Sequence, residues 1–179
     1  MCFSKNREIK VVDKKLEKIF LSNNSIQGYA RSDISYGIFI SGVLVYLMSF
    51  SHSSSNQHHG TWKILRQCPL IETRVDGAEA ELFNTFVSKH KPDNVISHID
   101  KRWLPSNWQH HAGFERQADT NIQYWYINRH TISRIHRSIL RKNKHDDRAL
   151  TEYENRSNQG YLRIWDCGSV VWLWGKKHT

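Results

Sequence analysis

The sequence is poor in cysteine and has no long apolar run, and each shortage excludes a class of protein. It contains three cysteines and no C-x-x-C pair, which argues against a disulfide scaffold and against a cysteine zinc site. The most apolar stretch, residues 36–50, is interrupted by polar residues and is shorter than the about 20 residues of a membrane-spanning helix. Residues 1–18 are charged throughout, without the apolar segment of a signal peptide. We therefore expect a cytoplasmic protein in a reducing compartment, with no membrane partner.

The histidines are numerous but follow no metal-binding pattern. None of the 11 falls in an H-E-x-x-H motif, at zinc-finger spacing or at the His-Asn-His spacing of a nuclease. Solvated or hydrogen-bonded histidines explain this scatter more simply than metal ligands do, although a ligand set can be assembled from separate loops. The sequence therefore leaves the metal content unknown.

Positive charge and aromatic side chains are what the sequence has in excess. The chain has 179 residues, and its 26 Lys and Arg against 17 Asp and Glu give a net charge of +9. This length fits a single domain, residues 1–179, and seven each of Trp, Tyr and Phe supply apolar area for its core. A positive surplus indicates a polyanionic partner, and DNA is the first candidate. Oligomeric state is not determined by these features.

The hydrophobic pattern predicts an α+β fold with a mixed central sheet and helices on both of its faces. Asp13 is a good N-cap for a helix that ends near Asn24. Ser41 and Gly42 have the composition of a tight hairpin turn, and the strand after them is apolar on both faces. Further strands are expected at residues 9–12, 35–40, 62–68, 94–99 and 122–127, helices at 78–89 and 106–111, and a polar loop at 51–60.

The last third of the chain is predicted to contain a basic segment, residues 129–160, followed by a terminal hairpin, residues 161–174. Arg134, Arg137 and Arg141 are three and four residues apart, so on a helix they share one face. If this stretch is extended instead, residues 132–135 form a strand. The spacing alone leaves both conformations open.

A turn before the helix at residues 78–89 is the first candidate site. Arg74-x-x-Gly77 leads into Ala78, and a glycine at a helix N-terminus lets backbone amides approach a phosphate, as in acyl-CoA-type transferases. The simpler interpretation is a glycine in a tight turn. Glu79 and Glu81 favour the helix but would repel a phosphate.

The end of the strand at residues 94–99 is the second candidate site. Ser97 lies in this strand and Asp100 follows it, next to Lys101 and Arg102. Ligands of open sheets gather at the carboxyl ends of strands, and Asp100 beside two cations stays ionised, so it could act as a base or as an orienting group. A salt bridge that ends the strand explains the same residues equally well.

The third candidate site combines basic and aromatic residues. Guanidinium and ammonium groups can contact phosphates, while aromatic rings can stack on bases, although a solvated charged face remains an alternative. The predicted DNA-binding residues are Arg129, Arg134, Arg137, Arg141, Lys142, Lys144, Tyr124 and Trp125.

Several segments together resemble two related groups of phage proteins. They include IQGYARSDISYGIFISGVLVYLMSF, Leu65-Arg66, Ile96-Ser97-x-x-Asp100-x-Arg102-Trp103, Tyr124-Trp125-Tyr126 and GYLRIWDCG at residues 160–168. The first group is a domain of phage proteins labelled as Hef-type homing endonucleases. The second, more distant group is the phage Mom DNA-modification proteins, which have the GCN5-related N-acetyltransferase fold.

The resemblance to Mom implies adenine modification of DNA by group transfer, in a phage-infected bacterial cell. It would place the important arginine and aspartate at Arg66, which could hold an anionic group, and at Asp100. Together with Ser97 and Arg102 they are the predicted catalytic residues of one cleft. The predicted residues for an acyl-CoA-type donor are Arg74, Gly77 and Ala78. Two departures from the Mom pattern are Gln109, where a Tyr is usual, and the sequence Gly77-Ala78-Glu79 at the helix start. The resemblance to the other group implies DNA cleavage with a divalent metal, and a third alternative is a non-catalytic DNA-binding accessory protein.

Overall fold

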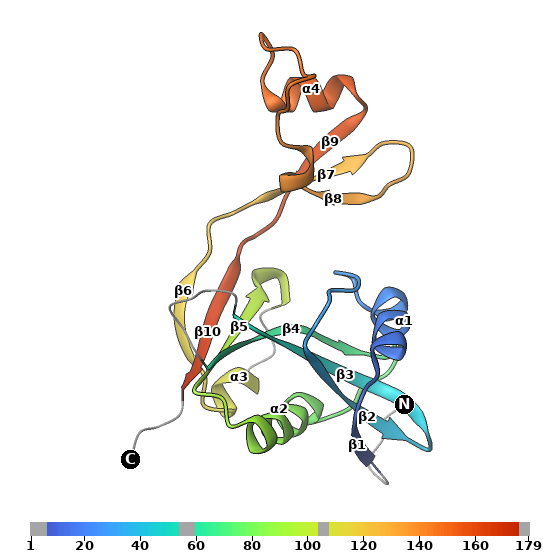
Figure 1. Ribbon diagram of the computed structural model, residues 1–179, viewed down its shortest axis with the longest axis vertical. Coiled ribbons are helices and arrows are strands. Elements are labelled where there is room, and N and C mark those ends of the chain that lie inside the picture. Colours follow the sequence, from blue (N-terminus) through green and yellow to red (C-terminus); the bar gives the residue numbers. More distant parts are fainter. Residues whose placement is uncertain (1–6, 54–59, 104–107, 176–179) are drawn as a thin grey trace. The chain divides into compact units, whose positions relative to one another are not determined.

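The computed structural model describes residues 7–53, 60–103 and 108–175, which form the helices and strands labelled in Figure 1. Parts of the expected loop at residues 51–60 and of the expected helix at 106–111 lie outside these ranges. The elements are β1 (Arg7–Val11), α1 (Lys14–Asn24), β2 (Ile34–Ile40), β3 (Val43–His52), β4 (Thr61–Pro69), α2 (Ala78–His90), β5 (Asn94–Asp100), α3 (Trp108–His111), β6 (Glu115–Asp119), β7 (Tyr124–Asn128), β8 (Arg134–His136), α4 (Glu152–Asn158), β9 (Tyr161–Trp165) and β10 (Ser169–Gly175).

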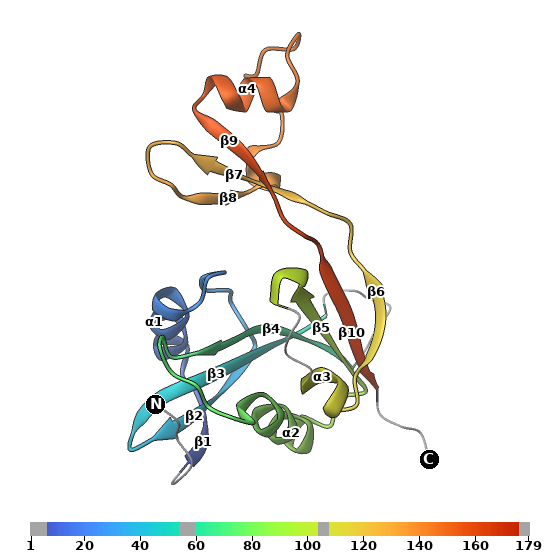
Figure 2. The ribbon, with the colours of Figure 1, turned by 180° about the vertical axis from the view of Figure 1, so that it is seen from behind.

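The chain divides into two compact units, where the sequence predicts one domain. Unit 1 consists of Met1–Ile99, Leu104–Ala118 and Val171–Thr179, and unit 2 consists of Asp100–Trp103 and Asp119–Val170. Most of the predicted basic segment belongs to unit 2. After the short segment Asp100–Trp103, the chain enters unit 2 again at the end of β6 and returns to unit 1 within β10. The colours of Figures 1 and 2 follow this path along the sequence.

Unit 1 is built on a seven-stranded mixed sheet with the order β1-β2-β3-β4-β5-β10-β6. The first four strands are antiparallel neighbours, and β5 runs parallel to β4. The predicted hairpin at Ser41-Gly42 is confirmed. Both turn residues have positive φ, +50° and +79°, as a two-residue turn that follows the twist of the strands requires.

Helices pack on both faces of this sheet, as predicted. On one face, Leu21 of α1 packs in a cluster with Leu47 of β3. On the other face, the ring of Phe86 in α2 stacks on Phe50 of β3 with centroids 3.8 Å apart and meets Trp62 edge-on. The side chains of β3 therefore enter two cores, which explains why the consecutive positions 44–48 of this strand are all apolar.

The ends of the two long helices follow their sequence signals. Asp13 caps α1, because its Oδ1 accepts hydrogen bonds from the amides of Lys15 and Leu16, each at 3.0 Å. The helix ends at Asn24, as expected. Gly77, with φ +75°, precedes α2, a left-handed conformation in which glycine carries little strain.

Unit 2 contains a second, three-stranded antiparallel sheet with the order β8-β7-β9. The predicted terminal hairpin is wrong, because β9 pairs with β7 while β10 joins the seven-stranded sheet. Asp166 explains the difference: its backbone amide bonds to the Gln123 carbonyl, and its Oδ1 accepts from the amides of Gln123 and Gly168. These bonds continue the pairing of β9 with β7 and leave no tight turn for a hairpin with β10.

Candidate functional site

Strands β4 and β5 separate in the middle of the unit 1 sheet. In the described part of the chain they pair from Thr61 and Asn94 to Ile64 and Ser97, and both strands continue beyond these pairs. A β-bulge at this point shifts the register of β4 against β3, since Ser49 faces Arg66 while Phe50 faces Ile64. A bulge bends its strand, so β4 turns away from β5 directly after their last pair. Such an opening between parallel strands is a common place for a ligand.

Arg66 lies just beyond this bulge, and its guanidinium holds the loop between α1 and β2. Nε donates to the carbonyl of Gly28 at 2.9 Å, Nη2 to that of Gln27 at 3.3 Å, and Nη1 to that of Leu65 at 2.7 Å. These bonds give Arg66 a clear structural task in unit 1. Its predicted catalytic role stays a prediction.

Ser97 is buried in β5, with 1% of its surface exposed. It forms the last paired position with β4, where the two strands begin to separate. A hydroxyl with so little exposure is closed to a large substrate in this conformation. Ser97 remains a candidate residue because it lies where β4 and β5 begin to separate.

Asp100 and Arg102 form a bidentate ion pair at the end of β5, within unit 2. The Arg102 guanidinium contacts both carboxylate oxygens, with Nη2 2.5 Å from Oδ2 and Nε 3.0 Å from Oδ1. The Arg102 amide also donates to Oδ1 at 2.9 Å. These bonds to Arg102 lower the pKa of Asp100, and the nearby charge of Arg134 acts in the same direction. Asp100 is therefore ionised but weakly basic, which suits it better to orient an amino group than to remove a proton.

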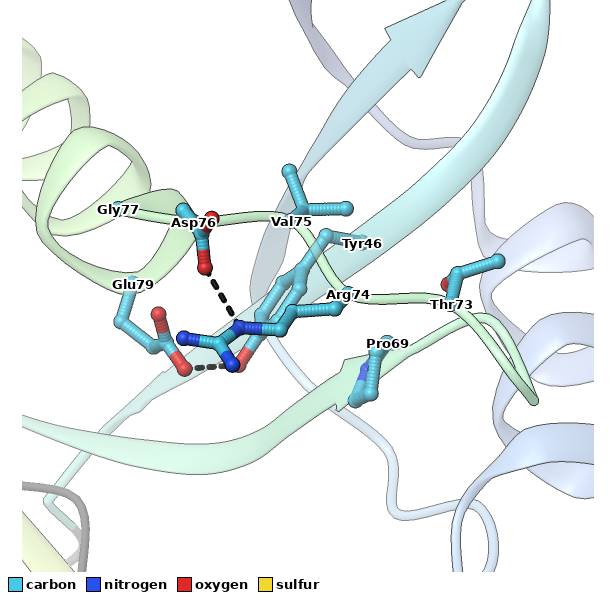
Figure 3. Close-up of a pocket in the computed structure, with 8 residues that line it drawn as sticks. All are labelled: Tyr46, Pro69, Thr73, Arg74, Val75, Asp76, Gly77 and Glu79. Carbon is cyan, nitrogen blue, oxygen red and sulfur yellow. Dashed lines mark hydrogen bonds and ion pairs between the residues drawn. The ribbon is translucent and has the colours of Figure 1, made fainter. Parts of the chain in front are cut away.

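The start of α2 lines a pocket of about 340 Å³ (Figure 3). Two carboxylates face it, and both are engaged. Glu79 accepts a hydrogen bond at 3.0 Å from the hydroxyl of Tyr46, and Asp76 accepts one at 2.7 Å from Nε of Arg74. Burial, followed by the charge of Glu79, raises the pKa of Tyr46. The tyrosine thus stays protonated and holds the Glu79 carboxylate in the pocket.

In unit 2, the neighbouring residues Tyr124 and Trp125 point to opposite faces of the small sheet. The Tyr124 hydroxyl, like that of Tyr126, donates to Glu152 of α4, so this face lies under the helix. Trp125 is on the other face, where the guanidinium of Arg134 lies 4.1 Å from its ring centroid. Of the two predicted stacking residues, Tyr124 is part of the packing of unit 2 and Trp125 is not covered by α4.

The predicted helical face of Arg134, Arg137 and Arg141 does not form. Arg134 begins β8, Arg137 begins a 3₁₀ helix (Arg137–Leu140), and Arg141 follows it. The extended alternative is thus closer to the structure, because β8 pairs with β7 and the pairing fixes Arg134 beside Trp125. Arg129, Arg134, Arg141, Lys142 and Lys144 are exposed and Arg137 is half-buried.

Lys142 is tied into the loop that carries it. Its Nζ donates to the carbonyls of Leu150 and Arg148 at 2.6 and 3.1 Å. Two donor positions of the ammonium are therefore used inside unit 2. Lys142 remains a predicted DNA contact, but it also closes a loop.

Two arginines that sequence reasoning missed hold unit 2 together. Arg163 of β9 lies among aromatic rings, 4.5 Å from the centroid of Tyr124 and 4.6 Å from that of Tyr153. Arg156 of α4 forms a buried bidentate pair with Asp146 at 2.6 and 2.7 Å. The alternation of Arg163 with apolar residues in YLRIW could have placed it on an inner face, whereas no local signal pairs Arg156 with Asp146.

Comparison with known proteins finds similar structures but no similar sequence. No family model matches the chain, and no curated protein matches it. The structure is similar to the ribosomal-protein-S18-alanine N-acetyltransferase of Escherichia coli, with a TM-score of 0.58, 5% identity, and coverage of 97% of this chain and 96% of that one. It is also similar to an IAA acetyltransferase from Bacillus cereus, with a TM-score of 0.58, 10% identity, and coverage of 96% of this chain and 100% of that one. A third similar structure is a Bacillus subtilis acetyltransferase in complex with CoA, with a TM-score of 0.57, 10% identity, and coverage of 96% of this chain and 99% of that one.

The chain has the fold of the GCN5-related N-acetyltransferases. This confirms the predicted fold class. At these identities the likeness shows the fold alone, and the resemblance to the two phage groups stays a prediction.

The residues at the start of α2 do not fit the pyrophosphate of a coenzyme A donor. The amides of a first helical turn attract an anion, and Gly77 opens the turn as predicted. The pocket, however, contains the carboxylates of Asp76 and Glu79 against the single guanidinium of Arg74, which is already bonded to Asp76. Since Tyr46 fixes Glu79 there, a bound pyrophosphate would meet an uncompensated negative charge.

The described parts of the chain, residues 7–53, 60–103 and 108–175, contain neither a metal-ligand cluster nor a membrane-spanning helix. No three His, Cys, Asp or Glu side chains come together there in a way that could hold a metal ion. None of the helices in these ranges is long and apolar enough to cross a membrane.

Proposed function

We propose that this chain binds nucleic acid, with DNA as the natural partner, through the basic segment of unit 2. The observation that carries the proposal is the charge of residues 129–148, which include seven Lys and Arg and two Asp. Both aspartates have partners within unit 2. Asp146 is paired with Arg156, and Asp147 accepts a hydrogen bond from the amide of Ala149.

The cations of this segment are available to a polyanion. Arg129, Arg141 and Lys144 are exposed, and so are Arg134 and Arg148. Neutralising phosphates releases counterions from the nucleic acid, which supplies most of the affinity of sequence-independent binding. Because the loop of residues 141–150 is fixed by the Asp146–Arg156 pair and by Lys142, its cations are held in a defined arrangement.

Salt-dependent binding tests this proposal. Arg141→Ala combined with Lys144→Ala removes two exposed cations of the segment, and we expect it to lower the slope of log K against log salt by about 2. Lys15→Ala combined with Lys18→Ala, on exposed positions of α1 in unit 1, removes the same charge and serves as the control. Fluorescence anisotropy with a labelled DNA measures both variants. If the two variants changed the slope equally, the binding would depend only on the net charge of the chain, and an interface in unit 2 would be contradicted.

Group transfer to a base of the bound DNA is a second candidate function. It is favoured by the acetyltransferase fold and by the Asp100–Arg102 pair, which belongs to the same unit as the basic segment. Asp100, kept ionised, would accept a hydrogen bond from the amino group of an adenine and orient it. No donor is assigned, since the pocket at α2 does not fit a pyrophosphate.

Nucleoside mass spectrometry tests the second candidate. DNA from cells that express the chain should contain a modified adenine, and Asp100→Asn should abolish it because the amide cannot offer a charged acceptor. Arg74→Gln, in the pocket of unit 1, provides a comparison that leaves Asp100 unchanged. Unmodified DNA from cells with the intact, folded chain would exclude this candidate and leave the binding proposal untouched.

A further inference from the structure

The small sheet of unit 2 has two unlike faces. One face is covered by α4, which lies beside β9 in Figure 1. On it, the hydroxyls of Tyr124 and Tyr126 bond to Glu152, Tyr126 is fully buried, and Arg163 fills the space between the rings. Around Tyr126 this face has the packing of a protein interior, whereas Trp165 at the end of β9 stays exposed.

The other face, here called the open face, has different properties. Its strand register brings together Trp125, Ile127, Arg134, His136, Leu162 and Ile164. None of the six is buried, and Leu162 is 42% exposed. At its centre, the guanidinium of Arg134 lies 4.1 Å above the ring of Trp125, and His136 meets the same ring edge-on at 4.8 Å. The ring of Trp125 is half-buried beside Arg134, and Arg134, His136 and Leu162 are exposed, so a surface that combines a ring, a guanidinium and aliphatic side chains remains accessible within a basic unit.

The charge of the three strands selects an anionic partner. On the open face they contribute Arg134 and His136 and no carboxylate, and the β7–β8 turn adds Arg129 and His130. Of the acids near these strands, Glu152 is on the covered face, and Asp100, whose pKa is lowered in part by the charge of Arg134, is already paired with Arg102. A partner for the open face should therefore carry negative charge together with flat apolar groups.

We propose that the open face binds single-stranded nucleic acid by stacking bases on Trp125 and on the guanidinium plane of Arg134. The inference rests on the proposed function and specifies its substrate class. Unpaired bases can stack on aromatic rings and on guanidinium planes, while the phosphates between them meet the cations at the edge of the sheet. In a duplex the bases are already stacked on each other, and a flat three-stranded face cannot reach them.

The Trp125–Arg134 pair supplies a sharp test, because its two members can be changed separately. Trp125→Ala removes the ring, and Arg134→Lys keeps the charge but removes the plane. We expect Trp125→Ala to weaken binding of a labelled single strand of about 12 nucleotides by about five- to one-hundred-fold, and Arg134→Lys by a smaller factor. Trp165→Ala is the matched control, since Trp165 is a tryptophan of the same sheet, 61% exposed, on the covered side.

Anisotropy measurements on the full chain with the single strand and with its duplex separate the outcomes. A preference for the single strand that Trp125→Ala removes, while Trp165→Ala keeps it, supports the inference. Equal affinity for duplex and single strand, unchanged by Trp125→Ala, overturns the inference and leaves the proposed nucleic-acid binding in place. No binding of either form overturns both. Circular dichroism of each variant verifies that unit 2 has folded.

Discussion

Unit 1 and unit 2 are stabilised by different kinds of contact. Unit 1 has two apolar clusters, one on each face of its sheet, with large side chains that are almost completely buried. In unit 2 the buried side chains are mainly polar: Asp146, Asn155 and Arg156 join Tyr126 and Val170. The first unit depends on apolar area removed from water, and the second on hydrogen bonds and ion pairs that must be satisfied in a fixed geometry.

This difference predicts different responses to mutation. An apolar core tolerates small changes of shape and loses stability roughly in proportion to the volume removed. A buried polar network is satisfied as a whole, so removing one member leaves its partners without hydrogen bonds. Unit 2 should therefore lose its structure through single polar substitutions that would be mild on a surface.

The largest expected loss is in unit 1, at Phe86. Phe86→Ala removes a fully buried ring that stacks on Phe50 and contacts Trp62, and we expect it to lower the free energy of unfolding by about 3–5 kcal/mol. Urea unfolding measures the loss, and hydrogen exchange should report it in α2 and β3. Phe39→Ala, at a half-buried ring, is the control with a smaller effect. A loss no greater than that of the control would contradict the apolar core of unit 1.

The next largest effect is expected in unit 2, at Arg156. Its guanidinium bonds to Asp146 and to the carbonyls of Leu140 and Arg141, so it joins α4 to the loop before it. Arg156→Leu leaves Asp146 buried and unpaired, and the thermal midpoint of unit 2 should fall by about 10 °C or more. Hydrogen exchange that accelerates in unit 2 but not in β3 would establish this. Arg148→Leu, at an exposed position, controls for the loss of an arginine.

Local signals predicted much of unit 1. Three features could each be predicted from a few neighbouring residues, and the structure agrees with all of them. They are the helix cap at Asp13, the hairpin turn at Ser41-Gly42 and the apolar strand β3. The α+β fold with helices on both faces follows from the order of these elements. Gly77 also lies where the pattern placed it, at the start of α2.

Unit 2 was harder to predict because distant residues determine it. The spacing of Arg134, Arg137 and Arg141 left a helix and a strand both open, and the pairing of β8 with Trp125 and its neighbours decides for the strand at Arg134. Asp166 likewise bonds to Gln123, 43 residues away, which sends β9 and β10 into different sheets. In the candidate sites, the partners of Glu79 and Arg66 come from Tyr46 and from the loop at Gly28, and neither follows from the motifs themselves.

A smaller effect is expected from acid, and it should be concentrated in unit 2. Hydrogen bonds from Arg156 lower the pKa of Asp146 in the folded protein. The stabilisation from this carboxylate is therefore complete above its unfolded pKa of about 4 and is lost as the pH falls through the lower, folded value. Urea midpoints of unit 2 should decline in this range, and Asp146→Asn should flatten the decline. An unchanged pH dependence in that variant would assign the acid sensitivity to other carboxylates of unit 2, such as Glu154, whose pKa is lowered mainly by the amide of Thr151.

The smallest effect concerns the pocket at α2 and leaves stability nearly unchanged. Glu79→Gln removes the negative charge but keeps an acceptor for the Tyr46 hydroxyl, so the first turn of α2 should become a better anion site. We expect acetyl-CoA, measured by calorimetry, to bind this variant about ten-fold more tightly than the unmodified chain. Glu81→Gln is the matched control, because Glu81 is in the same first turn but bonds to Arg7 instead of lining the pocket. An equal increase in acetyl-CoA affinity in both variants would mean that the net charge of the chain, and not the position of Glu79, controls binding. Tight binding by the unmodified chain would show that Glu79 does not oppose the pyrophosphate.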